Sequence, residues 1–418
     1  MIINHKNSYF ARRGLHLLLI VSMCNLMGLM GATVTENSPQ ALQTAINAGG
    51  EIKFGFSGTI NLSYPLIVAN DVVIDGAGQT ITLDGGYTST TTNQTGTRIF
   101  IINAGATLTL KNLTLTKGVS TNGGAIYVKN GAALISSNCL FSANNAIGAN
   151  GANGANGNNT ISVGGGGGNG VSGGSALGGA IYNEGDITLI TCLFSDNIAS
   201  GGNGGNGGNG GDGDFTGGNG GSGGNGGLAR GGALFSINKA AITNCTFYSN
   251  QATGGSGGNG GTNGVGGASN GRPGQGGCGA EASGAAIYNS GYLSVYGCTI
   301  YNNFCQGGNS MKAGTGASSN GNGGYAGGSS VGGGIVNTST NILINCTFYA
   351  NETYGGKGGD GGDSVDMIAG NGGNGGNAIG GSYFNTGKSW ITNCTFSSGN
   401  VVGGTNGVAG KGNFEGSP

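Results

Sequence analysis

The sequence contains little charge, little histidine and little arginine. Charged residues make up 7% of its 418 positions, against about 25% in ordinary globular domains. Both histidines, His5 and His16, lie in an N-terminal stretch that we interpret below as a leader. Beyond that stretch, acid–base chemistry has no imidazole and would depend on scattered carboxylates. This scarcity argues against an enzyme.

The charge balance gives no reason to expect nucleic acid or an anionic membrane surface as a partner. The formal net charge of the whole chain is −1. Removing Lys6, Arg12 and Arg13 from the 15 basic residues leaves 12 against 16 acidic ones, a net charge of −4. Proteins that bind such polyanions usually carry a basic patch or stripe.

Long apolar runs are also missing, except for one near the N-terminus. Three basic residues precede an apolar stretch over 15–30, and small residues follow it. The stretch is shorter than the run of about 20 apolar residues that a membrane span needs. It is typical of a secretory signal peptide, which we assign to residues 1–32. We therefore expect a secreted or cell-surface protein with no membrane span in the mature chain.

Glycine, by contrast, is abundant, with 101 residues, and it surrounds a phrase of about 20 residues that recurs. The copies lie at 123–144, 178–197, 231–250, 284–303, 332–351 and 380–400. Each copy holds one cysteine: Cys139, Cys192, Cys245, Cys298, Cys346 and Cys394, at spacings of 53, 53, 53, 48 and 48. Such regular spacing indicates a repeat architecture.

Each phrase predicts three short strands. In 178–197 these are GGAIY, an alternating run with Ile187 and Leu189, and a C-x-F strand whose Cys192 and Phe194 point to one side. Glycine this frequent disfavours helix. A unit of this size cannot bury its own apolar face and must stack on its neighbours. We therefore predict an all-β, single-stranded, right-handed parallel β-helix with one coil per phrase, each coil advancing about 4.8 Å.

The pairing of GGAI with a closing F-x-x-N resembles the passengers of polymorphic outer-membrane proteins, which are autotransported β-helices. The resemblance covers about 45–400, and the wider kinship is with the pectate-lyase-like superfamily. It implies a β-helix displayed on a bacterial cell surface, associated with the outer membrane or released. It transfers no catalytic residue.

The region 33–120 is predicted to form the N-terminal cap and the first coils. Residues 37–50 read as a short amphipathic helix that begins near Ser38-Pro39 and ends at a Gly pair. Such a helix would cover the open end of the stack. Two or three compact coils are expected between 51 and 120.

The glycine-rich inserts between coils are 33, 33, 33, 28 and 28 residues long, and a glycine-rich tail occupies 401–418. Their GGN triplets have the three-residue period of a polyproline-type helix. We predict that each insert runs out and back, and that neighbouring inserts bond sideways into a slab on one side of the β-helix. Flexible loops are the alternative, because composition alone suggests a linker.

Two further site predictions concern aspartate and cysteine. GGDGGDSVD at 358–366 fits a calcium-binding nonapeptide once, with Asp360, Asp363 and Asp366 as ligands and calcium as the sole cofactor considered. Cys278 and Cys305 flank one coil and predict a disulfide between neighbouring inserts. The six cysteines of the phrases are interpreted as a structural ladder of small buried thiols.

Three functions remain open. The first is a non-enzymatic adhesin or surface-structure protein that contacts carbohydrate or protein on a host or environmental surface. The second is a polysaccharide lyase or hydrolase, which the wider superfamily includes. The third is an ice-binding protein, suggested by flat, repetitive faces with few charges.

Overall fold

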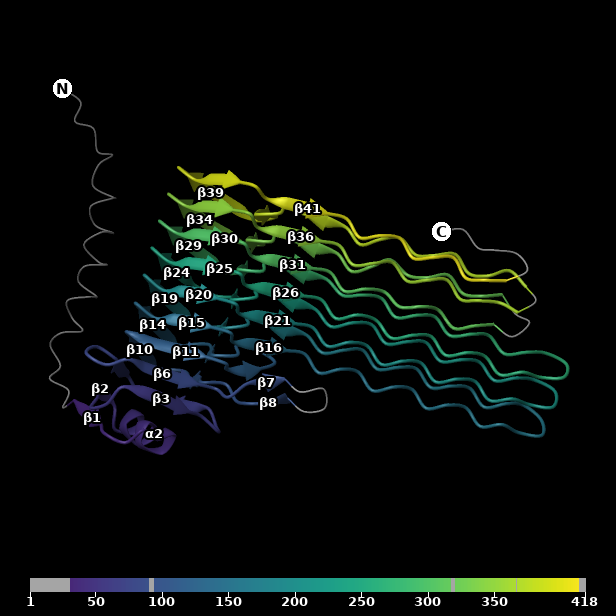
Figure 1. The fold of residues 1–418 in the computed structure, drawn as a ribbon, viewed down its shortest axis with the longest axis horizontal. Helices are drawn as coiled ribbons and strands as arrows, with labels where there is room; N and C mark the ends of the chain where they lie inside the picture. Colours follow the sequence, from purple (N-terminus) through teal and green to yellow (C-terminus); the bar gives the residue numbers. More distant parts are fainter. Residues whose placement is uncertain (1–30, 90–93, 317–319, 366, 413–418) are drawn as a thin grey trace, which may run out of the picture.

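The chain folds into a parallel β-helix from which long paired arms project to one side (Figure 1). This computed structural model describes residues 31–89, 94–316, 320–365 and 367–412. The predicted all-β fold class is therefore confirmed. The predicted leader lies almost entirely outside the described residues, and a first strand already begins at Ala32.

Three parallel sheets form the walls of the β-helix, and successive coils contribute one strand to each. The first sheet contains β1 (Ala32–Val34), β2 (Gly50–Phe54), β5 (Val72–Asp75), β10 (Thr107–Lys111), β14 (Ala133–Ser137), β19 (Asp186–Ile190), β24 (Ala240–Thr243), β29 (Tyr292–Tyr296), β34 (Thr340–Ile344) and β39 (Lys388–Thr392). The second contains β3 (Gly58–Asn61), β6 (Ile81–Asp84), β11 (Leu113–Thr116), β15 (Leu140–Ser142), β20 (Leu193–Ser195), β25 (Thr246–Tyr248), β30 (Thr299–Tyr301), β35 (Thr347–Tyr349) and β40 (Thr395–Ser397). The third contains β4 (Leu66–Val68), β9 (Phe100–Ile102), β13 (Ile126–Val128), β18 (Ile181–Asn183), β23 (Leu234–Ser236), β28 (Ile287–Asn289), β33 (Ile335–Asn337) and β38 (Tyr383–Asn385). The three strands predicted for each phrase are thus all present.

Two narrower parallel sheets, not predicted as strands, lie where the inserts leave and return. The outgoing sheet contains β12 (Val119–Ser120), β16 (Asn145–Ile147), β21 (Ile198–Ser200), β26 (Gln251–Thr253), β31 (Phe304–Gln306), β36 (Glu352–Tyr354) and β41 (Asn400–Val402). The returning sheet contains β17 (Ala176–Leu177), β22 (Ala229–Arg230), β27 (Ala282–Ser283), β32 (Ser330–Val331) and β37 (Ala378–Ile379). Alanines fill the space between these sheets, because side chains there must be small for the two layers to approach. The predicted tail starts inside β41, and its described residues continue as a further outgoing arm.

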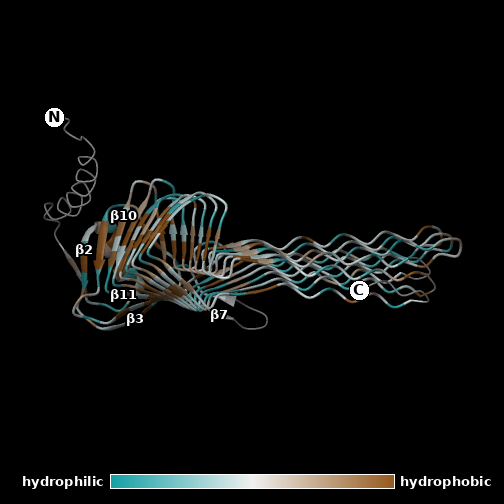
Figure 2. Ribbon diagram, turned by 90° about the horizontal axis from the view of Figure 1, so that it is seen from above, coloured by the Kyte–Doolittle hydropathy of each residue, from teal (hydrophilic) through white to brown (hydrophobic). Residues whose placement is uncertain are grey.

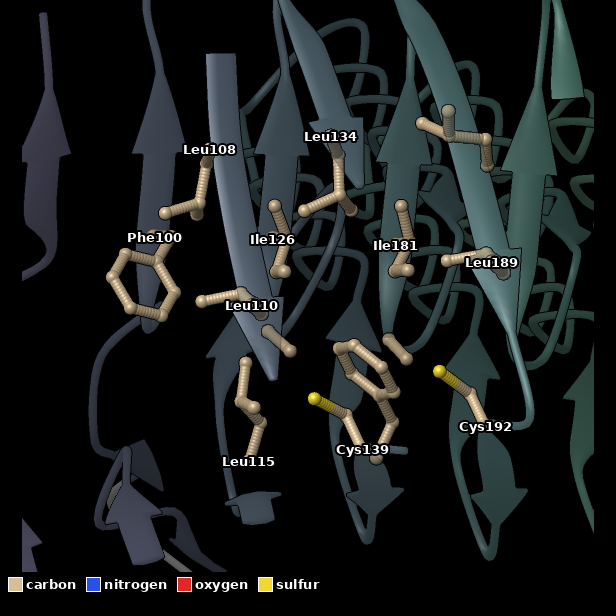
Figure 3. Packing of buried hydrophobic residues seen from close by; sticks show 14 of the residues in the cluster. Phe100, Leu108, Leu110, Leu115, Ile126, Leu134, Cys139, Ile181, Leu189 and Cys192 are labelled. Carbon is tan, nitrogen blue, oxygen red and sulfur yellow. The ribbon is translucent and has the colours of Figure 1, made fainter. Parts of the chain in front are cut away.

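The strand register repeats with the phrase, so like side chains stack on like. Phe141 pairs with Phe194 and Phe194 with Phe247, and their rings stack at centroid distances of 4.6 and 4.7 Å. Figure 3 shows the same rows for the inward leucines and isoleucines and for the cysteines. The strands that face this interior are brown in Figure 2, whereas the projecting arms are paler. The apolar core is thus one continuous column.

The C-x-F strand of each coil lies between two sharp corners whose residues have positive φ. The corner before it carries Asn112, Asn138, Thr191, Asn244, Gly297, Asn345 and Asn393. The corner after it carries Lys117, Ala143, Asp196, Ser249, Asn302, Ala350 and Ser398. Asparagine is enriched in this left-handed conformation because its short side chain bonds locally. These corners direct the following asparagine of the F-x-x-N motif into the interior.

The closing asparagines form a buried ladder. In Asn197, Nδ2 donates to Oδ1 of Asn250 at 2.9 Å and to the carbonyl of Phe141 at 2.9 Å. The other fully buried members are Asn144, Asn250, Asn303 and Asn351. The side-chain amides of Asn144, Asn197, Asn250 and Asn303 thus bond to both neighbouring coils, whereas that of Asn351 bonds to the preceding coil.

A helix closes the N-terminal end, as predicted. Ser38 caps helix α2 (Pro39–Ala48), and its side chain accepts a hydrogen bond from the Ala41 amide at 3.1 Å. Its buried residues Leu42, Ala45 and Ile46 pack on the core. Three coils, which start at β2, β5 and β10, precede the first insert. A small antiparallel pair, β7 (Thr88–Ser89) with β8 (Gln94–Thr95), extends from the second of them. In the described part of the chain, no helix is long and apolar enough to cross a membrane.

Replacing Asn250 by alanine tests the ladder. The change removes the acceptor of the Asn197 amide and side chain and leaves the Phe194 carbonyl without its donor. We expect a loss of about 2–3 kcal/mol, because buried polar groups lose their partners. Thermal and urea unfolding would measure it, with Thr246→Ala on the outer side of β25 as the control. Equal stability of the two variants would contradict the ladder's role.

Candidate functional site

The inserts form a two-layered slab, and this slab is the largest feature outside the β-helix (Figures 1 and 2). Outgoing arms make one layer: the Gly204 amide donates to the carbonyl of Ser256 in the next insert at 2.8 Å. Return arms make the other layer, as in the bond from Gly223 to Gln275. The Gly224 amide joins the layers by donating to the Gly205 carbonyl at 2.8 Å. The predicted sideways bonding is confirmed, and the flexible-loop alternative is wrong for the described arms.

Each position of a GGX triplet has its own hydrogen-bond partner. In an outgoing arm, the first glycine donates within its layer and the second donates to the other layer. The amide of the third residue donates to a side chain of the preceding insert and not to a backbone carbonyl. The Asn206 amide donates to Oδ1 of Asn153, and the Asn259 amide to Oδ1 of Asn206, both at 2.8 Å. Asparagine is therefore frequent at this position because it supplies the missing acceptor.

Packing distances explain why the first two residues are glycine. A Cβ on Gly204 would lie 2.0 Å from the carbonyl oxygen of Gly224, and one on Gly205 would lie 2.0 Å from that of Ala152. Real Cβ atoms do not approach backbone oxygens so closely. Glycine thus permits the contact between backbones that the hydrogen bonds require.

In the first insert, several second triplet positions carry alanine or valine in place of glycine. Ala149, Ala152 and Ala155 occupy the second triplet position of its outgoing arm, and Val171 occupies the same position of its return arm. No earlier insert lies beside these positions. Where a preceding insert is present, the position is mostly glycine, as at Gly202, Gly205 and Gly208, although Ala280 and Met311 also occupy it. The preference for glycine therefore follows the stacking of the arms.

The third residues form the two outer faces of the slab. On the outgoing layer they stand in rows such as Asn153, Asn206 and Asn259, all exposed. Rows repeat about every 4.8 Å across the arms and about every 9.3 Å along them, at roughly 3.1 Å per residue. Because the side-chain oxygens bond inside the slab, the NH₂ groups remain to face outward. Over the first two inserts this face is a regular, nearly uncharged array of asparagine side chains, whereas later inserts carry Ser256, Thr262, Lys312, Lys357, Asp360 and Asp363 at the same triplet position.

Asp360 and Asp363, two of the predicted calcium ligands, lie on this face but do not fit a calcium site. Lys357 donates to Asp360 at 2.8 Å, and Lys312 pairs with Asp363. Their second partners are the backbone amides of Val408 and Lys411. Asp366 lies outside the described residues. Among described residues, no three His, Cys, Asp or Glu side chains gather to hold a metal ion.

Lysines instead set the ionisation of these two carboxyl groups. The Lys312 hydrogen bond lowers the pKa of Asp363 below its ordinary value. For Asp360, burial raises the pKa, but the Lys357 hydrogen bond and the Val408 amide outweigh it and the pKa is lowered. Both carboxylates therefore stay charged and join neighbouring arms at the C-terminal edge of the slab.

The predicted disulfide between Cys278 and Cys305 is not formed, and both thiols are free. Outgoing and return arms run antiparallel, so Cys278 lies beside Ser310, whose hydroxyl accepts the Gly279 amide. Cys305 is buried in β31 against Ala282. Cys278 is four residues farther out than Ala282, about 12 Å at roughly 3.1 Å per residue. The bases of the arms meet as expected, but the two cysteines sit at different depths along them.

The cysteine ladder consists of free thiols, as interpreted from the sequence. Five members are buried and Cys394, in the last coil, is half-buried. The Cys192 amide donates to Sγ of Cys245 at 3.3 Å, and the Cys245 amide to Sγ of Cys298 at the same distance. In this register the thiols serve as packing and as weak acceptors.

A second polar cluster lies on the outer side of the third sheet. Glu184 accepts hydrogen bonds from Tyr127 at 2.7 Å and Tyr182 at 3.0 Å. Burial, followed by the bond to Glu184, raises the pKa of each tyrosine to about 12. Arg98 stacks over Tyr127 but donates to Ser120 and to two backbone carbonyls. Each group is thus already bonded within the fold.

Acidic residues in the first coils hold turns. Oδ1 of Asp75 accepts the Ala77 amide and a bond from Asn112. Oδ1 of Asp84 accepts the Gly86 amide. Both carboxylates are thus bonded within their own turns.

Comparisons with known proteins add little to this geometry. No family model and no curated protein matches the chain. It is similar to the crystal structure of jun a 1, the major allergen from cedar pollen, at 12% identity and a TM-score of 0.31, covering 91% of this chain and 80% of that one. A second similar structure is Geobacillus virus E2 ORF18, at 12% identity and a TM-score of 0.28, covering 95% of this chain and 66% of that one. A third is the A-module of the mannuronan C-5 epimerase AlgE6 from Azotobacter vinelandii, at 10% identity and a TM-score of 0.18, covering 87% of this chain and 94% of that one.

A matched pair of substitutions tests whether the slab is built by backbone contact. Gly205→Ala places a Cβ against the Ala152 carbonyl, so the amides of 201–227 should lose protection from hydrogen exchange by at least ten-fold. Ala152→Gly, at the open edge, should leave protection unchanged, because no neighbour constrains that position. In the parent chain these amides should be protected. Exchange at unstructured rates would contradict the slab.

The lysine–aspartate pairs predict a pH dependence at the C-terminal edge. Because the folded pKa of Asp363 is lowered, its stabilising effect is present above its unfolded pKa of about 3.9 and is lost as the pH falls through the lower folded value. Hydrogen-exchange protection of 357–363 should therefore decline on acidification below about pH 4. In Asp363→Asn the decline should be smaller, and protection of 201–209 should serve as the control in both proteins. An identical decline in the two proteins would rule out this pair as its source.

Proposed function

We propose that the chain is a non-enzymatic adhesive protein, secreted or displayed on a bacterial cell surface. Its slab makes repeated contacts with carbohydrate or another polar surface. The observation that carries the proposal is the array of outward amide groups held at fixed spacing by backbone hydrogen bonds. The signal-peptide pattern and the resemblance to surface-displayed passengers support the location.

Rigidity favours such a surface for weak, repeated contacts. Binding usually costs free energy because side chains and loops must become ordered. Here the arms are already held by sideways bonds and the side-chain oxygens by the next arm, so that cost is reduced. Many equivalent amides along several arms then add their contributions by multivalency.

The carbohydrate-active alternative has no such support from the described carboxylates. Glu184 is occupied by two tyrosines, Asp75 by a turn, and Asp360 and Asp363 by lysines. Hydrolysis of a glycosidic bond would need two facing carboxyl groups with a substrate between them. An assay for unsaturated or hydrolysed products of pectin, with and without calcium, would overturn the non-enzymatic proposal if it were positive.

Ice binding is a second candidate, favoured by one observation. The outer face of the outgoing layer presents polar groups in a flat, regular array with little charge. Measurements of thermal hysteresis and of ice recrystallisation inhibition test it directly, and the absence of both would remove it.

Serine substitutions provide the direct test of the contact surface. Serine can still accept the neighbouring amide, as Ser172 does from Asn225, but it lacks an outward NH₂ group. We expect N153S/N206S/N259S to keep the slab's hydrogen-exchange protection and to lose at least ten-fold in retention on a panel of cellulose, chitin, xylan and pectin.

The control is T246S/T299S/T347S, on the outer side of the second sheet, which should bind like the parent. If no polysaccharide retains the parent chain, carbohydrate as the ligand is wrong. If the slab triple variant binds as well as the parent, the amide face is not the contact surface.

A further inference from the structure

The C-terminal end of the β-helix leaves inward apolar side chains exposed. In the last described coil, Ile391 and Phe396 are each 44% exposed. In the coil before it, the positions paired with them, Leu343 and Phe348, are fully buried. Both pairs hold the same place in the repeat, so the exposure of Ile391 and Phe396 comes from the end of the described stack. We call the open side of the coil 378–402 the end face.

The end face contains a hollow and an unpaired polar group. The hollow has a volume of about 420 Å³, and Tyr383, Ile391 and Phe396 are among the residues that line it. Oγ of Ser382, which also lines it, is buried and has no hydrogen-bond partner among the described residues. Buried polar groups in folded proteins are rarely left unpaired. The end face therefore combines apolar surface with free hydrogen-bonding capacity, as an interface does.

The backbone also has unpaired strand edges at the end face. Strands β37, β38, β39, β40 and β41 are each the outermost strand of their sheets. Such edges can pair with another chain, and proteins usually protect them with charge, proline or a covering segment. Residues 378–402 contain one charged residue, Lys388, and no proline. At the opposite end, α2 packs on the core (Figure 1). Only one end of the described column is therefore covered.

The shape of the end face restricts what can cover it. A partner must pair with the edges of three walls at once and fill the apolar space between them. Helix α2 prevents the N-terminal end of another copy from doing so, whereas the end face of another copy has the same outline. The coil 378–402 supplies about 25 residues, and each side of a stable protein–protein interface usually contributes about 20–30. The end face is therefore large enough for a stable dimer.

The order of the walls shows how two end faces can meet. In each coil the chain runs through the third, first and second sheets and then leaves along the outgoing arm. The slab therefore projects from the side opposite the first sheet, as Figure 2 shows for β2. A two-fold axis through the first sheet and along the slab sets β39 antiparallel to β39 of a second copy, and β40 beside β38. Centred on Trp390, this pairing places Lys388 opposite Thr392 and keeps the two lysines apart.

We infer that two copies of this chain form a dimer through their end faces. The interface is isologous, because each copy contributes the same surface, and it continues the column of stacked coils from one copy into the other. Both slabs then project in the same direction. The dimer doubles the number of outward side-chain rows that are available for repeated contacts. The inference does not depend on the identity of the surface that the slab binds.

Sedimentation equilibrium of the full chain tests the dimer. The end variant is I391D/F396D, which places carboxylates on the end face. The control is I190D/L193D, which changes apolar residues of similar exposure, 40% and 39%, on the outer sides of β19 and β20. We expect the parent and the control to have the mass of two chains at micromolar concentration. The dissociation constant of the end variant should rise at least ten-fold, because burying unpaired charges costs free energy.

Disulfide cross-linking tests the orientation of the two copies. Residues directly opposite each other in an antiparallel pair have Cα atoms about 4.5–5.5 Å apart, which a disulfide can span. Oxidation of W390C should therefore give a cross-linked dimer. K388C should not cross-link, because the two copies of position 388 lie four residues apart along the paired strands, about 13 Å. The parent chain, whose own cysteines are free, provides the background.

Three results would overturn the inference. They are a monomeric parent at every concentration, equal association of the parent and the end variant, and faster cross-linking of K388C than of W390C. Growth beyond the dimer would contradict a closed two-fold interface. Hydrogen exchange of 201–227 should confirm that each variant keeps its slab. If the end variant loses this protection, the cross-linking result decides.

Discussion

Hydrogen bonding between parallel strands one coil apart is the constraint on which the rest of the molecule depends. It sets a step of about 4.8 Å and aligns each position with the same position of the next phrase. A side chain that packs well once therefore packs well in every coil. The phenylalanine stack, the asparagine ladder and the cysteine ladder all follow from this alignment. Asparagine can remain buried because neighbouring coils supply its hydrogen-bond partners.

In the slab, the same hydrogen bonding between neighbours one coil apart orders glycine-rich inserts that could not fold alone. Ordering glycine costs more conformational entropy than ordering any other residue, and a polyproline-type arm makes no hydrogen bonds within itself. The coils hold successive arms one strand spacing apart, so each arm finds acceptors on the arms beside it. In the first insert, which has no preceding insert beside it, alanines occupy the second triplet position in place of glycine. The slab is therefore ordered by the β-helix beneath it.

The slab faces and the outer turns of the inserts differ in surface chemistry. Much of the slab's outgoing face presents amides, because asparagine accepts a backbone bond from the next insert and its NH₂ group is left outward. The outer turns lie beyond the last triplet, where this requirement ends and apolar residues occur. Near the C-terminal edge of the slab's outgoing face, Lys312 pairs with Asp363 of the next insert and Lys357 pairs with Asp360 of its own arm. This division of the surface agrees with the adhesive role that we propose.

The sequence by itself determined the coil, the cap and the run of the inserts, because each leaves a local and periodic trace. The alternation around Ile187 and Leu189, the spacing of the cysteines and the GGN triplet all reflect contacts that recur in every repeat. The acceptor role of the third-position asparagines had a signal too, since that residue recurs at one place in the triplet. The exposed apolar residues of the outer turns could have been found where the triplet breaks.

Only the tertiary structure decided contacts that occur once. Cys278 and Cys305 flank the same coil, yet antiparallel arms place them at different depths. Asp360 and Asp363 match a calcium pattern, yet Lys357 and Lys312 occupy them, the second from a neighbouring insert. Such pairings depend on the register between arms, which follows from how the coils stack and cannot be read within one repeat.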